Sequence, residues 1–242
     1  ESLCKAWQNL LKTAKFEILY IGDSPADKAK EVFAKAFANI ERNVVISSTD
    51  VVKNVLKEKH ITEEMELSQS KLVMGFRTQI SAGDEEVVAE RLMCAVLGGT
   101  ASSKLFNNVR EKQSLCYYCG SSALRATGVM MVDSGVEPGR EAQAEAAILK
   151  ELNDLCTGPI TEQEMDDCRR SLLSSLDSLG DSLGGLESWY YGQILRDEAL
   201  APPEYGKVLT NAVTADEVRE VLQSYHYSVG YTLTAKGEGE NA

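Results

Sequence analysis

The order of predicted elements indicates an α+β protein in which helices cover one face of a mostly antiparallel sheet. Strand patterns come first, followed by two consecutive helices, two further strands, several helices and a closing strand. A doubly wound parallel sheet would instead alternate strands and helices regularly. Apolar positions recur every second residue in the predicted strands and every third or fourth residue in the predicted helices, so each segment can be assigned in turn.

The first third of the chain combines short apolar segments with a helix-start signal. Residues 15–22 alternate apolar and polar positions as a strand does. Ser24 and Pro25 then predict a helix over residues 24–40, with serine as its cap and proline at its first position. Two more strands are expected at residues 44–48 and 71–78. Between them, residues 49–62 are expected to form an extended connector or an edge strand.

Helices dominate the rest of the chain. A helix is expected from residue 83 to residue 97, and the acidic residues at its start interact favourably with the helix dipole. Thr161 and Thr214 each stand three residues before a glutamate, the pattern of a capping box. The remaining strands are expected at residues 115–125, 128–135 and 227–236. Helices are expected at residues 138–155, 186–196 and 214–224. A further helix starts at residue 161 and is expected to break at Gly180 and Gly184–Gly185.

The composition is that of a globular protein with a large core. Of 242 residues, 43% are hydrophobic and 26% are charged, and a chain of this size buries roughly 70% of its unfolded surface. We expect residues 1–242 to form one domain, and the start at Glu1, without a methionine or leader, suggests a fragment of a longer chain. The net charge of −12 argues against nucleic acid or an anionic membrane as partner. No apolar run reaches the ~18 residues that span a bilayer.

Six cysteines are scattered along the chain. Cys116 and Cys119 have the C-x-x-C spacing of redox and metal sites, so thiol chemistry is one hypothesis. On a regular strand, however, residues three apart point to opposite faces, which predicts that these two sulfurs diverge and that Tyr118 faces away from Tyr117. No second pair completes a four-ligand zinc site. The favoured prediction is buried, reduced thiols in a cytoplasmic protein.

Residues 97–118, LGGTASSKLFNNVREKQSLCYY, form the most informative segment. A glycine turn, a serine cap and a short helix lead into a strand. Arg110 falls in the last turn of the helix and Tyr117 at the start of the strand, so we expect both near one helix-to-strand corner. At the other end of the helix, free backbone amides near Gly99 and Ser102 could hold an anion or a substrate carbonyl, although turn chemistry alone also explains these residues.

This segment resembles a signature of insulinase- and processing-peptidase-type metallopeptidases, the inverzincins. Their zinc-free half carries a run of the form G-G-x-x-S-S-x-L-F-x-x-x-R-E-K-x-x-L-x-Y, which residues 98–117 follow. The order of elements is similar over nearly the whole chain and implies a processing-peptidase-like fold. The resemblance also implies that Arg110 and Tyr117 reach across to the zinc site of the other half, where negative charge develops on a peptide carbonyl oxygen.

The zinc ligands of these peptidases are missing from this chain. Inverzincins bind zinc through H-x-x-E-H on a helix and a distant glutamate. The two histidines, His60 and His226, do not form this motif. His60 begins H-x-x-E-E, with Glu64 in place of the second histidine, in an acidic segment that we expect to be extended. We therefore expect no metal in this chain and zinc in a partner half.

Two functional hypotheses follow. In the first, the chain is inactive alone but joins a zinc-bearing domain or subunit of the same fold, or a second copy, to close a chamber around a peptide substrate. Arg110 and Tyr117 would then bind the substrate or the transition state, with Gly99 and Ser102 as further substrate contacts. In the second, it is a catalytically inactive pseudo-peptidase that acts as an assembly or peptide-binding module. Zinc-dependent peptide cleavage that requires this chain would separate the two.

Overall fold

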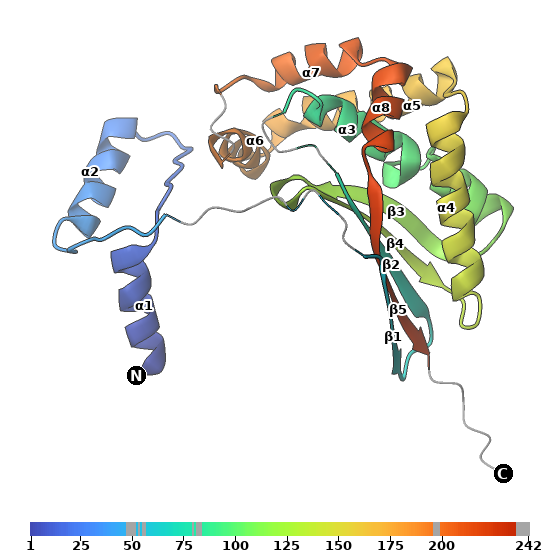
Figure 1. Ribbon diagram of the computed structural model, residues 1–242. Helices are drawn as coiled ribbons and strands as arrows, with labels where there is room; N and C mark the ends of the chain where they lie inside the picture. Colours follow the sequence, from blue (N-terminus) through green and yellow to red (C-terminus); the bar gives the residue numbers. More distant parts are fainter. Residues whose placement is uncertain are drawn as a thin grey trace.

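A computed structural model shows a five-stranded sheet with helices gathered on one side (Figure 1). It describes residues 1–46, 52, 54, 57–78, 80, 84–195 and 199–235. The strands lie in the order β1-β5-β2-β4-β3; they are β1 (Lys59–Met65), β2 (Ser70–Arg77), β3 (Cys116–Leu124), β4 (Val129–Val136) and β5 (His226–Ala235). Among the pairs of neighbouring strands in the described residues, β1 and β5 are parallel and the other three pairs are antiparallel. The prediction of an α+β fold with a mostly antiparallel sheet is confirmed.

The helices fall into an N-terminal pair and a group beside the sheet (Figure 1). The N-terminal pair is α1 (Ser2–Thr13) and α2 (Ala26–Phe37). The group beside the sheet is α3 (Val87–Cys94), α4 (Glu141–Thr157), α5 (Glu162–Asp177), α6 (Leu183–Leu195), α7 (Pro203–Ala212) and α8 (Ala215–Gln223). Shorter segments are the π-helical η1 (Ala95–Gly99) and η2 (Leu105–Lys112), and the 3₁₀ turns η3 (Arg125–Thr127) and η4 (Ser178–Asp181).

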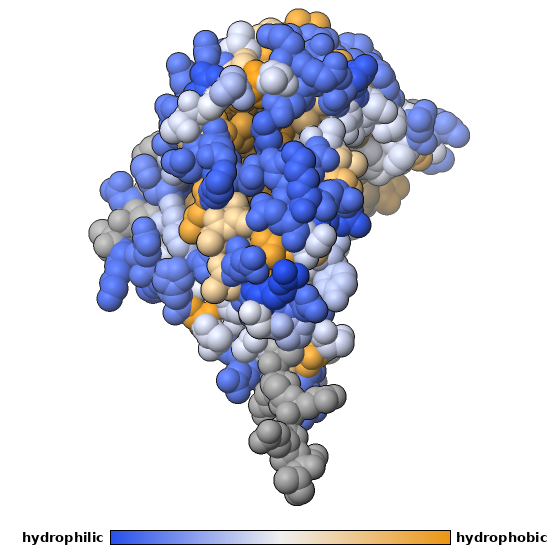
Figure 2. Space-filling view, turned by 90° about the vertical axis from the view of Figure 1, so that its right-hand side faces the viewer, coloured by the Kyte–Doolittle hydropathy of each residue, from blue (hydrophilic) through white to orange (hydrophobic). Residues whose placement is uncertain are grey.

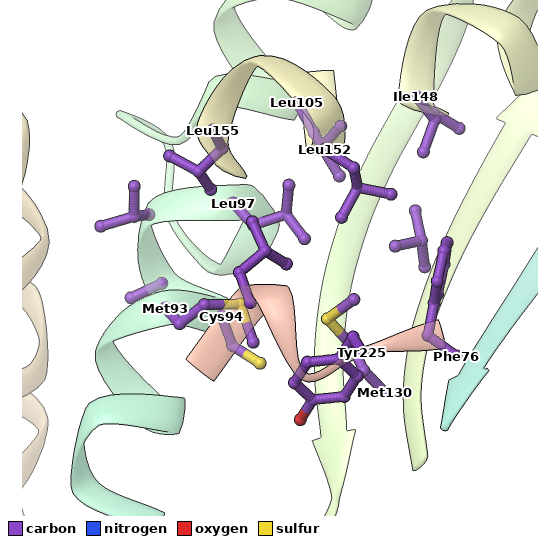
Figure 3. Close-up of a cluster of buried hydrophobic side chains, with 14 of the residues drawn as sticks. Phe76, Met93, Cys94, Leu97, Leu105, Met130, Ile148, Leu152, Leu155 and Tyr225 are labelled. Carbon is purple, nitrogen blue, oxygen red and sulfur yellow. The ribbon is translucent and has the colours of Figure 1, made fainter. Parts of the chain in front are cut away.

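The core lies between the sheet and these helices. In β2, Leu72, Met74 and Phe76 are buried, whereas the intervening Lys71 and Val73 are only half-buried, so one face of the strand packs against helices. Figure 3 shows side chains from the sheet, from α3, η1 and η2, and from α4 converging there: Phe76, Met93, Leu97, Leu105, Met130, Ile148, Leu152 and Leu155. Burial of each such side chain stabilises the fold by roughly 1.5–3 kcal/mol.

Local end signals are mostly where the sequence predicts them. Both capping boxes form: the hydroxyls of Thr161 and Thr214 accept hydrogen bonds from the third helical N–H at 3.2 Å, at the starts of α5 and α8. The tight turn between β3 and β4 contains Gly128 at a φ of 61°. The sequence reasoning missed α1 and α7; Pro203 begins α7, because proline is well tolerated in a first helical turn.

Three boundary predictions are wrong. Ser24 does not cap α2, since Pro25 occupies the cap position and no side-chain cap bond forms. Gly184 and Gly185 lie inside α6 and do not break the helix, whereas the predicted break at Gly180 is confirmed, because Gly180 lies in η4 between α5 and α6. Residues 44–46 are not part of a strand. The predicted ends at residues 48, 83, 196 and 236 lie outside the described residues.

Residues 1–46 stand apart from the sheet (Figure 1). Neither α1 nor α2 buries any residue. Residues 15–22, predicted as a strand, are not in strand conformation and pair with no strand among the residues described. The sequence has the alternating pattern of a strand, but a strand also needs a neighbouring edge, which no described segment supplies. The buried core is therefore built without residues 1–46.

Gly98 allows η1 to approach β3 closely. A Cβ atom at this position would lie 2.6 Å from the Ser121 nitrogen and 2.9 Å from Leu105 Cδ1. We expect Gly98→Ala to lower the free energy of unfolding by about 2 kcal/mol, because the backbone of β3 must shift. Urea unfolding followed by circular dichroism measures this change. Gly180→Ala is the control, since nothing lies within 4 Å of its Cβ position. Equal losses at the two glycines would contradict the prediction.

Candidate functional site

The turn between η2 and β3 forms the corner that carries Arg110 and Tyr117. η2 ends with hydrogen bonds from Ser114 N to Arg110 O (3.1 Å) and from Leu115 N to Val109 O (3.2 Å). Ser114 has a φ of 50°, a left-handed conformation that commonly ends helices and is usually occupied by glycine. Leu115 is 1% exposed and anchors the start of β3 in the core. The corner is therefore fixed from both sides.

Ser114→Gly should stabilise the protein. Glycine adopts the left-handed conformation without the steric cost that a Cβ atom imposes, so we expect a gain of about 1 kcal/mol in the free energy of unfolding. Thermal unfolding of the variant should show a raised Tm. Ser122→Gly is a matched control, because this serine is exposed within β3, where glycine lowers stability by roughly 0.5–1 kcal/mol. Two changes of the same sign would refute the argument.

Arg110 is held by two neighbours while remaining partly open to solvent. Its guanidinium carbon lies 4.6 Å from the centroid of the Phe106 ring, and Nη1 lies 3.6 Å from Glu111 Oε1. The side chain is 38% exposed. The ring restricts the guanidinium without using its N–H donors, and the ion pair with an exposed glutamate is weak. Arg110 can therefore donate hydrogen bonds to an oxygen that approaches the corner.

Tyr117 is an extra residue in β3. Cys116 pairs with Val136 and Tyr118 pairs with Gly135, with a register shift between them, so Tyr117 sits in a β-bulge. Tyr117 is 62% exposed and Tyr118 is 39% exposed. The predicted opposition of the two tyrosines assumed unbroken alternation, which the bulge interrupts. Such bulges commonly re-aim a side chain, and here both phenols reach solvent.

The same bulge overturns the prediction that the sulfurs of Cys116 and Cys119 diverge, whereas the prediction that these two thiols are buried and unpaired is confirmed. Cys116 and Cys119 are both buried, at 9% and 6% exposure, rather than on opposite faces. A hydrogen bond from the Cys119 thiol is the main cause that lowers the pKa of Cys116; together with Ser134 and the charge of Arg110 it outweighs the effect of burial and brings the pKa to about 7. That hydrogen bond and burial raise the pKa of Cys119. The chain's six cysteines are free.

Gly99 and Ser102 lie at the other end of η2 from Arg110. The Ser102 hydroxyl is 3.2 Å from Thr100 Oγ1, which is itself 3.6 Å from Cys168 Sγ in α5. Among the residues described, no hydrogen bond or ion pair joins Gly99 or Ser102 to the Arg110 corner. The structure thus brings Arg110 and Tyr117 to one corner and leaves the other two residues elsewhere. The substrate-binding role of Gly99 and Ser102 stays a prediction.

The described part of the chain does not fit a zinc ion. No three His, Cys, Asp or Glu side chains in it are grouped as metal ligands. His60 lies on β1, where its Nδ1 is 3.6 Å from Glu145 Oε1, and His226 begins β5. The H-x-x-E-E sequence is therefore on a strand, as predicted, rather than on a helix.

A buried ionic cluster was missed by the sequence reasoning. Glu90 in α3 is 2% exposed, its Oε2 lies 2.9 Å from Arg125 Nε, and its Oε1 accepts a hydrogen bond from the Tyr225 hydroxyl. Burial raises the pKa of Tyr225, and the charge of Glu90 adds to this effect. Burial also raises the pKa of the neighbouring Cys94 to about 12. The only sequence signal for this cluster was an acidic residue between apolar positions of α3.

Comparison with known proteins identifies the family. The sequence matches the peptidase M16 inactive domain over residues 1–172. The chain belongs to this family. The probable inactive metalloprotease YmfF of Bacillus subtilis (strain 168) is 25% identical over 219 residues, which cover 90% of this chain and 51% of that protein. The uncharacterized zinc protease YmxG of the same organism is 28% identical over 131 residues, 53% of this chain and 32% of that protein.

A solved structure agrees with this assignment. The conserved protein from Enterococcus faecalis V583 superimposes with a TM-score of 0.86 at 27% identity, covering 99% of this chain and 56% of that chain. This chain thus spans about half the length of YmfF and of the enterococcal protein. The resemblance to inverzincins, and to their zinc-free domain in particular, is confirmed.

Proposed function

We propose that this M16 inactive domain is the zinc-free half of a peptide-hydrolysing zinc metallopeptidase. It closes a chamber against a zinc-bearing half, and Arg110 and Tyr117 bind the peptide or the negative charge that develops on its carbonyl oxygen. The observation that supports this role most directly is the corner itself: a guanidinium with free donors and an exposed phenol flank one rigid turn. Zinc would belong to the partner half.

The chemistry of the two side chains suits this role. An oxyanion is stabilised by donors that are already in place when the charge develops, and removal of one such donor typically costs ~10²–10³ in rate. The Arg110 guanidinium is always charged and offers several N–H groups, and the Tyr117 hydroxyl adds a neutral donor. Either group can also hold the peptide backbone in register.

The cellular setting rests on fewer observations. None of the helices in the described residues is both long and apolar enough to cross a membrane. The chain's free cysteines are typical of a reducing compartment. From the cysteines we propose a cytoplasmic setting, with a peptide as the substrate.

The test is to combine this chain with the zinc-bearing half from its source and to follow cleavage of fluorogenic peptides. We expect cleavage only when both halves are present, abolished by a chelator and restored by zinc. Peptide binding without cleavage at any zinc concentration would instead support an inactive binding module. The name of YmfF, a probable inactive metalloprotease that matches 90% of this chain, favours this second candidate.

A further inference from the structure

Residues 1–46 carry apolar side chains that nothing in the described chain covers. In α1, Leu3, Trp7 and Leu10 follow helical spacing and are 80%, 57% and 43% exposed. In α2, Val32 and Phe33 are 59% and 39% exposed. By contrast, the side of the molecule in Figure 2 is largely hydrophilic, with separate apolar spots. Apolar surface concentrated in one unit marks an interaction site.

This exposure belongs to a folded unit. The Arg42 guanidinium carbon lies 4.8 Å and 5.1 Å from the ring centroids of Phe16 and Phe37, and the two rings are 5.3 Å apart. Backbone hydrogen bonds of 2.9 Å and 2.8 Å tie residues 43 and 45 to the end of α1. These contacts hold α1, the extended segment and α2 together, so their apolar faces are presented in a fixed arrangement.

The segment between the two helices has the alternating sequence pattern of a strand but lies in no sheet among the residues described. Residues 16–22 form no backbone hydrogen bond with any other described residue. Ile18, Tyr20 and Ile21 are 46%, 42% and 38% exposed. A hollow of about 510 Å³ opens between this segment and α2, lined in part by Phe33. An unpaired backbone edge next to exposed apolar side chains offers a template on which another strand can pair.

The chain contains the same construction in completed form. Two residues separate α8 from β5, just as two residues separate α1 from residue 16. α8 buries Val218, Val221 and Leu222, and β5 pairs with β1 and β2. In this part of the fold, α8 packs its apolar side chains in a layer of helices, and the strand that follows it pairs with sheet edges. The occupant that fits residues 1–46 is a second layer of helices on a sheet.

We propose that residues 1–46 dock onto a second sheet-and-helix domain, carried by the other half of the assembly, and add residues 16–22 to its sheet. The inference rests on the proposed function only in requiring that such a half exists. The enterococcal structure matches 99% of this chain yet leaves 44% of its own length uncovered, so that relative has room for a further domain. The unit's seven basic and six acidic residues nearly cancel, in contrast to the net charge of −12 of the whole chain, which favours an apolar contact.

Hydroxyl-radical footprinting tests the inference on the complete native protein or complex and on the isolated chain. Trp7, 57% exposed in α1, is the reporter, and Tyr205, 54% exposed in α7, is the matched control. We expect Trp7 oxidation to fall several-fold in the native assembly while Tyr205 oxidation stays constant. Trp7→Glu should also weaken association of the halves by at least roughly tenfold, because a buried tryptophan anchor is a typical hot spot; Tyr205→Glu should not.

Cross-linking from Lys5 and Lys12 of α1 identifies what covers the unit. Cross-links to a region outside residues 1–242, together with Trp7 protection, support the inference. Equal Trp7 oxidation in both samples overturns it, as do cross-links to residues 59–235 of a second copy. Protection without peptide cleavage would keep this inference and reject the proposed function. Peptide cleavage with an unprotected Trp7 would keep the proposed function and reject this inference.

Discussion

Arg110→Ala is expected to reduce peptide turnover by the assembled protein roughly 10²-fold, while the domain keeps its fold. The guanidinium is the charged donor of the corner, and loss of one donor to a developing oxyanion typically costs ~10²–10³ in rate. Its contacts with Phe106 and Glu111 are made at a partly exposed site, so their loss changes the free energy of unfolding little. Steady-state kinetics with a fluorogenic peptide measure kcat, and thermal unfolding checks the fold.

Variants on the same helix separate a specific donor from general charge. Lys112→Ala removes a positive charge two residues away, where Lys112 Nζ donates to Asn108 Oδ1 at 2.9 Å instead of facing the corner; we expect near wild-type kcat. Arg110→Lys keeps the charge but loses the planar fork of donors, so it should recover only part of the activity. Tyr117→Phe removes a single hydroxyl. Equal turnover in Arg110→Ala and Lys112→Ala would reject the role of Arg110.

The parts of the fold that were predictable are those set by neighbouring residues. The capping boxes at Thr161 and Thr214 each depend on a few consecutive positions. The positions of Arg110 and Tyr117 at one corner are also set by neighbouring residues, because a short helix leads directly into the strand. What these two side chains bind is set by a partner and stays a proposal.

The parts that were missed depend on contacts distant in sequence. The bulge at Tyr117 arises from how β3 pairs with β4, so the simple alternation rule placed the two cysteines on opposite faces when they lie together. Residues 15–22 have the pattern of a strand but no edge to join among the described residues. Glu90 meets Arg125 from another element, and nothing in its own helix indicates the partner.

Arg125→Met is expected to lower the free energy of unfolding by about 3 kcal/mol, the largest stability change predicted for this chain. Glu90 is 2% exposed, and the substitution would leave its carboxylate with the Tyr225 hydroxyl as a hydrogen-bond donor but without its ion-pair partner. Removal of one member of a buried ion pair typically costs about 3–5 kcal/mol; the lower end applies because the Arg125 side chain is 27% exposed. Urea unfolding followed by circular dichroism measures the loss.

A double-mutant cycle shows whether the loss comes from the pair itself. With Glu90→Gln as the second change, no buried charge remains unpaired, and the double variant should be more stable than Arg125→Met alone, because replacing both members of a buried pair is often nearly neutral. Arg219→Met is the comparison for a lost arginine: its side chain is 27% exposed, as that of Arg125 is, but it forms an ion pair with Asp216, whose side chain is 81% exposed, so a smaller loss is expected. A double variant no more stable than Arg125→Met would mean that packing of the arginine stem, and not the buried charge of Glu90, ties α3 to the β3–β4 turn.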